Sequence, residues 1–270
     1  MAFNDFLFRK KYYGYKWSIP CEVCGSGELQ SEEKKIQEWE TFESYANRNS
    51  DPENWESEYY EGAFIAELSC DAEGCGNNIA VSGQSIVEIT DIEIHDPEDG
   101  PQAIESVIYL PRNFSPVFNL IEIPMEIEFP IRKILYKSFE LYWLDNDACA
   151  NKIRQFVESL LDSYRVKKRI RVVKNGTAKY ISLPLHKRIE EYTKTRADLG
   201  EILMAIKWIG NAGSHHSLGL ENQDLVDAYR MLDHFFEEAY FIKTKRKKIK
   251  QLTKTILKTK KPVSKSKRKK

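Results

Sequence analysis

The sequence predicts an α+β protein, in which a small antiparallel β module precedes an α-helical bundle with an inserted β-hairpin. Three observations support this fold class. The first half has strand-like composition around two cysteine pairs, and a proline-bounded stretch at residues 124–130 separates it from sequence with helical periodicity. The second half contains Asn175-Gly176, a dipeptide typical of tight hairpin turns. We expect a β-rich module over residues 1–124, a helical bundle over 125–242 and a basic, disordered tail over 243–270.

The β-rich half contains four segments of strand-like composition, bounded by turn-forming residues. Upstream of them, Ile36, Trp39, Phe42 and Tyr45 recur at roughly helical spacing. This spacing predicts a helix over residues 31–46, between the two cysteine pairs. The predicted strands are residues 63–68, residues 79–90 with a break at Ser82-Gly83, residues 104–110 and residues 120–123.

The helical half shows apolar residues at spacings of three and four, which is typical of helices with one buried face. In one segment this stripe consists of Ile153, Phe156, Val157, Leu160 and Leu161. Ser182 is expected to cap a short helix, and Asp198 with Glu201 is expected to form a capping box for the next. The predicted helices are residues 131–144, residues 147–165, a short helix ending near residue 194, one beginning at residue 198, and residues 222–242.

Length and composition fit a folded protein outside the membrane. The chain has 270 residues and 41% hydrophobic content, which is enough for a substantial core. No run of eighteen apolar residues occurs, and the N-terminus mixes aromatic with charged residues instead of offering an apolar signal segment. The sequence therefore predicts a cytoplasmic protein under reducing conditions, where paired cysteines are more often metal ligands than disulfides.

Four of the five cysteines form two pairs. Cys21 and Cys24 are separated by two residues, Cys70 and Cys75 by four, and a glycine follows each pair. Zinc prefers four tetrahedral thiolate or imidazole ligands, and glycine turns let two sulfurs point at one ion. The pattern predicts one structural zinc site. Two alternatives stay open: all four cysteines are ordinary buried thiols, or the imidazole of His95 replaces one ligand. The fifth, Cys149, lies in a helical pattern and is expected to be a small buried residue.

Charge is strongly segregated along the chain. The segment Lys243 to Lys270 contains fifteen Lys or Arg and no Asp or Glu, so the remainder carries 26 basic against 41 acidic residues. Such a tail attracts the phosphates of RNA or other nucleic acid through counterion release. The alternative is a solubilising tail that folds back onto the acidic body.

A short polar motif lies in the helical half. Lys207, Asn211 and His215 are spaced by four residues, so on a helix they fall on one face and can converge on one ligand. Gly210 and Gly213 are poor helix formers, which suggests close approach of another backbone or a ligand. The alternatives are a helix that ends at Gly213, and a packing role in which Asn211 and His215 are buried and hydrogen-bonded.

Several segments together resemble the prokaryotic domain-of-unknown-function family 4145, over roughly residues 15–240. They are the two cysteine pairs, Pro-Arg-Asn-Phe-Ser-Pro at 111–116, Trp-Leu-Asp at 143–145, Ala-Asn-Lys-Ile-Arg at 150–154, and above all Lys-Trp-Ile-Gly-Asn-Ala-Gly-Ser-His at 207–215. Members of that family are similar to the HEPN superfamily, helical domains that include metal-independent ribonucleases of antiviral defence and toxin systems.

The resemblance implies a function for the polar motif. Lys207 stands where the superfamily has arginine, and Asn211 and His215 match its polar residue and histidine. The implied role is a metal-independent ribonuclease, in which these three residues are catalytic, the zinc is only structural, and a homodimer brings two motifs together. The alternative is a non-catalytic module of a defence or restriction system that binds nucleic acid, a nucleotide or a partner protein.

Overall fold

The computed structural model describes residues 3–93, 102–174, 177–215 and 219–259, and its contacts divide the chain into two units. The sheet unit comprises residues 2–120 and 136–149, and the helical unit comprises residues 121–135 and 150–270. The predicted α+β class, with a β-rich first part and a helical second part, is confirmed. Among the described residues, no helix is long and apolar enough to cross a membrane.

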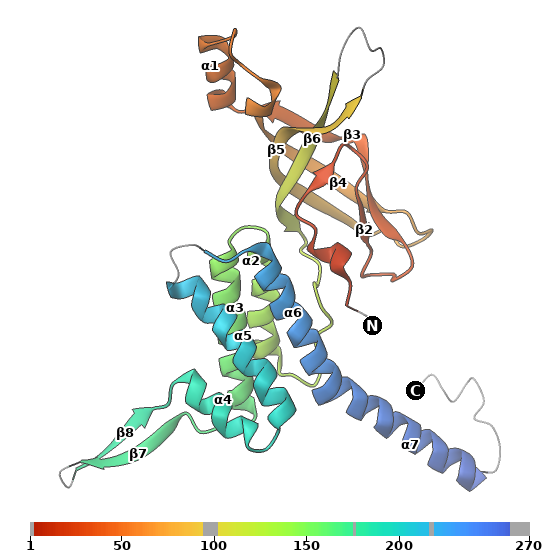
Figure 1. Ribbon diagram of the computed structural model, residues 1–270. Helices are drawn as coiled ribbons and strands as arrows, with labels where there is room; N and C mark the ends of the chain where they lie inside the picture. Colours follow the sequence, from red (N-terminus) through yellow and green to blue (C-terminus); the bar gives the residue numbers. More distant parts are fainter. Residues whose placement is uncertain (1–2, 94–101, 175–176, 216–218, 260–270) are drawn as a thin grey trace. The chain divides into compact units, whose positions relative to one another are not determined.

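The sheet unit is built on one six-stranded antiparallel sheet with the strand order β1-β6-β5-β4-β3-β2 (Figure 1). The long strands β3 to β6 therefore pair with their neighbours in sequence, apart from the crossover that brings β1 to β6. The elements are the 3-10 helix Asp5–Phe8, β1 Tyr12–Tyr13, β2 Ser18–Pro20, β3 Glu28–Glu40, α1 Phe42–Ser50, the 3-10 helix Ser57–Tyr59, β4 Glu61–Cys70, β5 Asn78–Glu93 and β6 Gln102–Ser115.

The core of the sheet unit is aromatic. Trp17, Phe64 and Tyr109 are buried and mutually in contact, with ring centroids 4.9 to 5.3 Å apart. Phe64 and Leu68 belong to the buried set that alternates along β4, as expected for a strand with one face in the core. Three of the four predicted strands are confirmed as β4, β5 and β6, and the predicted break at Ser82-Gly83 is a register irregularity inside β5. The fourth is wrong, because residues 120–123 form no strand.

The helix predicted over residues 31–46 is wrong for most of its length. Residues 28–40 form β3, and only the last part of the predicted range is helical, in α1. The four apolar residues behind the prediction do not share a buried face, because Trp39, Phe42 and Tyr45 are all exposed. Pairing with β4, which joins Ile36 to Ala66 and Trp39 to Ala63, satisfies the backbone of this segment and overrides its local periodicity.

One short stretch of helical sequence packs with the sheet. The hydroxyl of Tyr142 donates to the carbonyl of Phe8 at 2.8 Å, and the ring of Trp143 lies 4.6 Å from that of Phe114. These contacts place residues 136–149 in the sheet unit, although the sequence boundary was expected near residue 124. The aromatic side chains at the end of the helix Phe129–Tyr142 (α2) are therefore buried against residues of the sheet unit.

The remaining elements are mostly helical, and the predicted stripe of α3 is buried along its whole length, from Ile153 to Leu161. The predicted helix-start signals are wrong at two places: Ser182 pairs with Arg169 across the hairpin, and Asp198 lies inside the first turn of α5. The elements are α2 Phe129–Tyr142, α3 Asn146–Ser163, β7 Arg169–Lys174, β8 Thr177–Ser182, α4 Leu185–Thr193, α5 Ala197–His215, α6 Asn222–Phe236, the π-helix Glu237–Phe241 and α7 Ile242–Thr259.

The hairpin between α3 and α4 is confirmed as β7 and β8, while its predicted turn, Asn175-Gly176, lies outside the described residues. For the basic tail from residue 243, the sequence predicts disorder beyond about Leu257 and leaves open that the preceding helix continues into the tail for some turns; the chain is helical through Thr259, as that continuation requires. Neither Gly nor Pro interrupts residues 242–259, and lysine is a good helix former, so nothing in this segment ends the helix. Residues 260–270 lie outside the described residues.

Candidate functional site

The four paired cysteines come from two neighbouring loops of the sheet unit. Residues 21–27 connect β2 to β3, and residues 71–77 connect β4 to β5. Antiparallel pairing of β3 with β4 places Leu29 opposite Cys70, so the two loops meet at one end of the sheet. Sheet pairing thus brings together cysteines that are about 50 residues apart in sequence.

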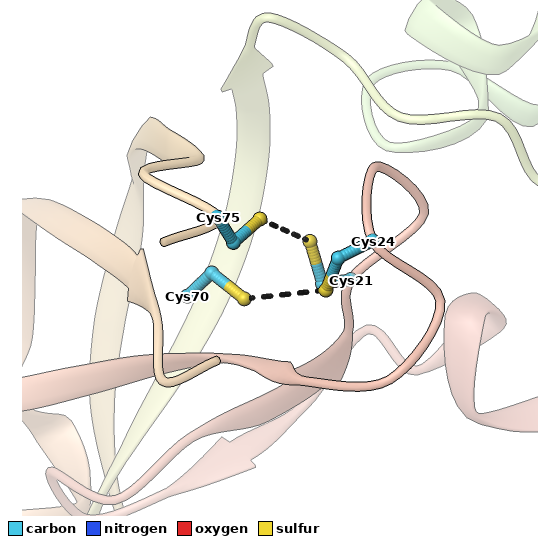
Figure 2. Close-up of side chains that lie close together, drawn as sticks. All are labelled: Cys21, Cys24, Cys70 and Cys75. Atoms are coloured by element: carbon cyan, nitrogen blue, oxygen red, sulfur yellow. Dashed lines mark hydrogen bonds between the residues drawn. The ribbon is translucent and has the colours of Figure 1, made fainter. Parts of the chain in front are cut away.

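The four sulfurs gather around one point (Figure 2). All lie within 4.8 Å of one another, with 3.8 Å between Cys21 and Cys75 and 3.7 Å between Cys24 and Cys70. A disulfide requires about 2.05 Å between sulfurs. Four thiolates at about 2.3 Å from a tetrahedral ion lie about 3.8 Å apart. The spacing therefore fits the coordination sphere of one metal ion and not a pair of disulfides.

Backbone turns aim each cysteine pair inward. In the first loop, the amide of Gly25 donates to the carbonyl of Cys21 at 2.9 Å, and the amide of Cys21 donates to Gly27 at 2.9 Å. In the second loop, the amide of Cys70 donates to Asn77 at 2.8 Å. Gly25 has a φ of +66°, a left-handed conformation that most residues avoid, so the glycine after the first pair is required by the turn.

Hydrogen-bond donors stabilise the thiolates of the first pair, Cys21 and Cys24, whereas the pKa values of Cys70 and Cys75 are raised. Backbone N–H groups of Ser26 and Gly27 lower the pKa of Cys24 to about 6, and the Gly27 amide lies 3.3 Å from its sulfur. Burial raises the pKa of Cys21, but the Cys24 amide and the Asn77 side chain, 3.4 Å from the sulfur, outweigh burial and lower it. A divalent cation would offset the repulsion that several such thiolates create at this spacing.

The two loops are held together by residues that the sequence did not single out. Asp71 accepts from the amide of Glu28 at 2.7 Å and from the side chain of Gln30 at 2.9 Å. A side chain at Gly27 would lie 2.6 Å from the Cβ of Ala72 and 2.8 Å from the sulfur of Cys70. The only sequence signal for this contact was the glycine itself, since the partner loop becomes a neighbour only in the folded sheet.

Of the other cysteine predictions, one is confirmed and one lies outside the structure. Cys149 is fully buried, and its thiol donates to the carbonyl of Ser138 at 3.3 Å. It takes no part in the four-cysteine cluster. His95 lies outside the described residues, so its role as an alternative ligand stays a prediction.

The polar motif of the helical unit lies on α5. Lys207 is buried, and its ammonium lies 3.3 Å from the ring centroid of Trp208. Among the described residues no carboxylate pairs with Lys207, and desolvation, followed by the nearby charge of Arg154, lowers its pKa. Trp208 is itself exposed and also contacts the ring of His186. The Lys207 ammonium thus packs against the face of an exposed indole.

The other motif residues are placed in less detail. The helix continues through His215, so Gly213 does not end it. Asn211 is half-buried, and the side chain of His215 lies outside the described part of the structure. A side chain at Gly210 would lie 2.8 Å from the Cβ of Arg154 and 3.2 Å from the carbonyl of Ala150. Gly210 thus allows α3 and α5 to approach closely, which confirms the packing reason for this glycine.

Two family models match the chain. Residues 137–252 match a domain of unknown function, DUF4145, and residues 9–114 match another, DUF8608. The predicted resemblance to family 4145 is therefore confirmed for the helical part, while the cysteine pairs that were assigned to it lie in the DUF8608 match. No curated protein and no solved structure matches the chain. The chain is thus similar to DUF8608 over the segment that carries the four cysteines, and to DUF4145 over most of its helical part.

Proposed function

We propose that this protein binds nucleic acid through its helical unit, and that a structural zinc ion holds the loops of its sheet unit together. The observation that carries the proposal is α7. It contains eight Lys or Arg residues and no acidic residue, and every described residue from Lys245 to Lys258 is exposed. Phosphate backbones are the natural partners of such a helix, because each neutralised phosphate releases a condensed counterion.

The charges of α7 are largely free for a partner. Within its described residues one ion pair forms, between Lys245 and Glu237 at 2.8 Å. Ile249, Leu252 and Ile256 form an exposed apolar stripe on the same helix. This stripe offers a second contact surface, either for nucleic acid bases or for a second copy of the chain. The predicted homodimer remains part of the proposal, and light scattering of the full chain measures it.

The metal assignment rests on ligand chemistry. Four sulfur ligands at tetrahedral spacing are typical of structural zinc, and a filled sphere leaves no open position for a water nucleophile. Cys21, Cys24, Cys70 and Cys75 would hold the ion, which would supply cross-linking of two loops and no catalysis. One equivalent of zinc per chain after purification is the expected result, and less than half an equivalent would contradict it.

Nucleic-acid binding is tested by fluorescence anisotropy with labelled RNA and DNA oligonucleotides over a range of salt concentrations. The affinity is expected to fall steeply with salt, with a logarithmic slope of about −0.7 to −0.9 per phosphate contact. Deletion of residues 243–270 should remove most of this slope. Salt-insensitive binding, or binding unchanged by the deletion, would argue for a protein partner instead.

A metal-independent ribonuclease is the second candidate, and the contacts around α5 favour it. Lys207 lies near Arg154, and among the described residues no carboxylate pairs with Lys207, whereas Arg154 is paired with Glu158 at 3.5 Å. In this mechanism the ribose 2′-hydroxyl attacks the adjacent phosphate, His215 transfers protons, and Lys207 stabilises the developing negative charge. Asn211 would orient the phosphate or the imidazole.

The nuclease candidate is tested with labelled RNA in EDTA. The expected result is cleavage by the wild type in EDTA and loss of that cleavage in His215→Ala. Undiminished cleavage by His215→Ala, or no cleavage by the wild type, would remove this candidate and leave the binding function. A defence or toxin role is a further part of this candidate, and its measure is growth inhibition on expression, with His215→Ala as the control.

A further inference from the structure

The hairpin formed by β7 and β8 stands out because it is exposed on both faces (Figure 1). Tyr180 is 72% exposed, Val173 62% and Ile181 51%, and of the strand side chains that the structure describes only Val172 is half-buried. An isolated two-stranded hairpin is at best marginally stable in water. Burial within the hairpin does not account for these exposed apolar side chains. A contact with a binding partner would account for them.

The charged residues of this hairpin are all positive. From Arg165 to Ser182 the chain carries Arg165, Lys167, Lys168, Arg169, Arg171, Lys174 and Lys179, and no Asp or Glu. The carboxylate beside its base, Asp162, is already paired with Lys168 at 2.6 Å and with Arg188 at 2.5 Å. Among the described residues, Arg169 and Arg171 form no ion pair. Their guanidinium groups are therefore available to an external anion.

The strand register places two arginines and a tyrosine on one face. Arg169 and Arg171 are two residues apart on β7, so their side chains point to the same side. Tyr180 lies directly opposite Arg171 on β8, and paired residues also share a face. The two arginine Cα atoms are about 7 Å apart along a strand, which is comparable with the spacing of successive phosphates in an extended nucleic acid strand.

We propose that this face of the β7–β8 hairpin, defined by Arg169, Arg171 and Tyr180, binds single-stranded nucleic acid. The two guanidinium groups contact successive phosphates, and the phenol ring stacks on an unpaired base. The inference rests on the nucleic-acid binding proposed for the helical unit and adds to it a second contact surface, far in sequence from α7. The exposed Tyr180 favours a single strand over a duplex, because stacking requires a base face that pairing and stacking in a duplex would occupy.

The hairpin is tested in the full chain by anisotropy with labelled single-stranded RNA, single-stranded DNA and duplex DNA. The variant Arg169→Glu/Arg171→Glu should weaken single-strand binding more than tenfold at low salt and reduce the salt slope by about 1.4, which corresponds to two lost phosphate contacts. Tyr180→Ala should weaken it by about 5- to 140-fold with an unchanged slope, because stacking carries no counterion release. Both variants should melt like the wild type, since the substituted side chains are exposed.

A charge-matched control separates a specific contact from general electrostatics. Lys133→Glu/Lys194→Glu makes the same change in net charge at two exposed positions, one in α2 and one at the C-cap of α4, and should leave affinity within about twofold. If the hairpin variants equal this control while deletion of residues 243–270 abolishes binding, the hairpin inference fails and the proposed function stands. If the wild type binds no nucleic acid, the proposed function itself fails. Equal affinity for duplex and single strand, insensitive to Tyr180→Ala, overturns the assignment to single strands.

Discussion

The cysteine cluster and the α5 motif were both recognised from short spacings, but the fold treats them differently. The four sulfurs arrive from two loops and take up metal-like spacing, and those of Cys24 and Cys21 receive hydrogen bonds from Gly27 and Asn77. Lys207 instead is buried, with its ammonium against the ring of its own neighbour, Trp208. Packing gives a sufficient reason for Lys207 and Gly210, whereas packing gives none for four converging thiols. Convergence from separate parts of the chain is therefore stronger support for a site than spacing within one helix.

The largest expected effect follows removal of one sulfur ligand. Cys70→Ser, or chelation of the wild type, should release the metal and unfold the sheet unit at a lower temperature, because metal binding and folding of such loops are coupled. The measurement combines metal content with near-ultraviolet circular dichroism, which reports the aromatic core around Trp17. Cys149→Ala, which removes a thiol outside the cluster, is the control and should retain the metal. A Cys70→Ser variant with full metal content would contradict the cluster.

The second prediction concerns Lys207. Lys207→Ala should destabilise the helical unit by about 2–5 kcal/mol, because it leaves a cavity beneath Trp208. Lys207→Met keeps the volume and removes an unpaired charge, so its cost should stay below about 1.5 kcal/mol. Urea denaturation measures both. If Lys207→Met folds normally yet abolishes RNA cleavage, the lysine has a catalytic role and the contrast with the cysteines disappears.

Gly27 tests how closely the two cysteine loops must approach. Gly27→Ala should cost about 1–3 kcal/mol, since the added methyl group overlaps Ala72 and the sulfur of Cys70. It should also weaken zinc binding, as measured by competition with a chromogenic chelator. Gly25→Asn is the matched control: space at Gly25 is open, and asparagine tolerates its left-handed backbone. If Gly27→Ala and the wild type bind zinc with equal affinity, close approach of the two cysteine loops is not required for zinc binding.

The smallest expected effect concerns the link that Asp71 makes between the same loops. Asp71→Asn preserves size but replaces one acceptor oxygen by an amide, so one of the two hydrogen bonds to Glu28 and Gln30 should be lost. The expected cost is about 1 kcal/mol, measured by urea denaturation of the zinc-bound chain. Glu73→Gln changes the charge of the same loop equally at an exposed position and should have no measurable effect. If Asp71→Asn and Glu73→Gln have the same free energy of unfolding, the hydrogen bonds of Asp71 do not stabilise the two loops.

Local patterns determined much of this protein from sequence alone. The apolar stripe of α3, the strands β4 to β6 and the hairpin β7–β8 were predicted because each is encoded by residues that are neighbours in the chain. The same holds for the two cysteine pairs, whose ligand type and glycine turns are local. The charge segregation was also visible, since counting residues requires no structure.

Only the tertiary structure decided which of these segments meet. Pairing with β4 made residues 28–40 a strand in spite of their helical spacing, and it brought the loop of Cys21 beside that of Cys70. The same kind of long-range contact buried Lys207 and gave Gly210 and Gly27 their neighbours. The physical reason is that burial and sheet pairing depend on residues far apart in the chain, so a sequence can indicate a ligand set or a periodic face but not the neighbour that will complete it.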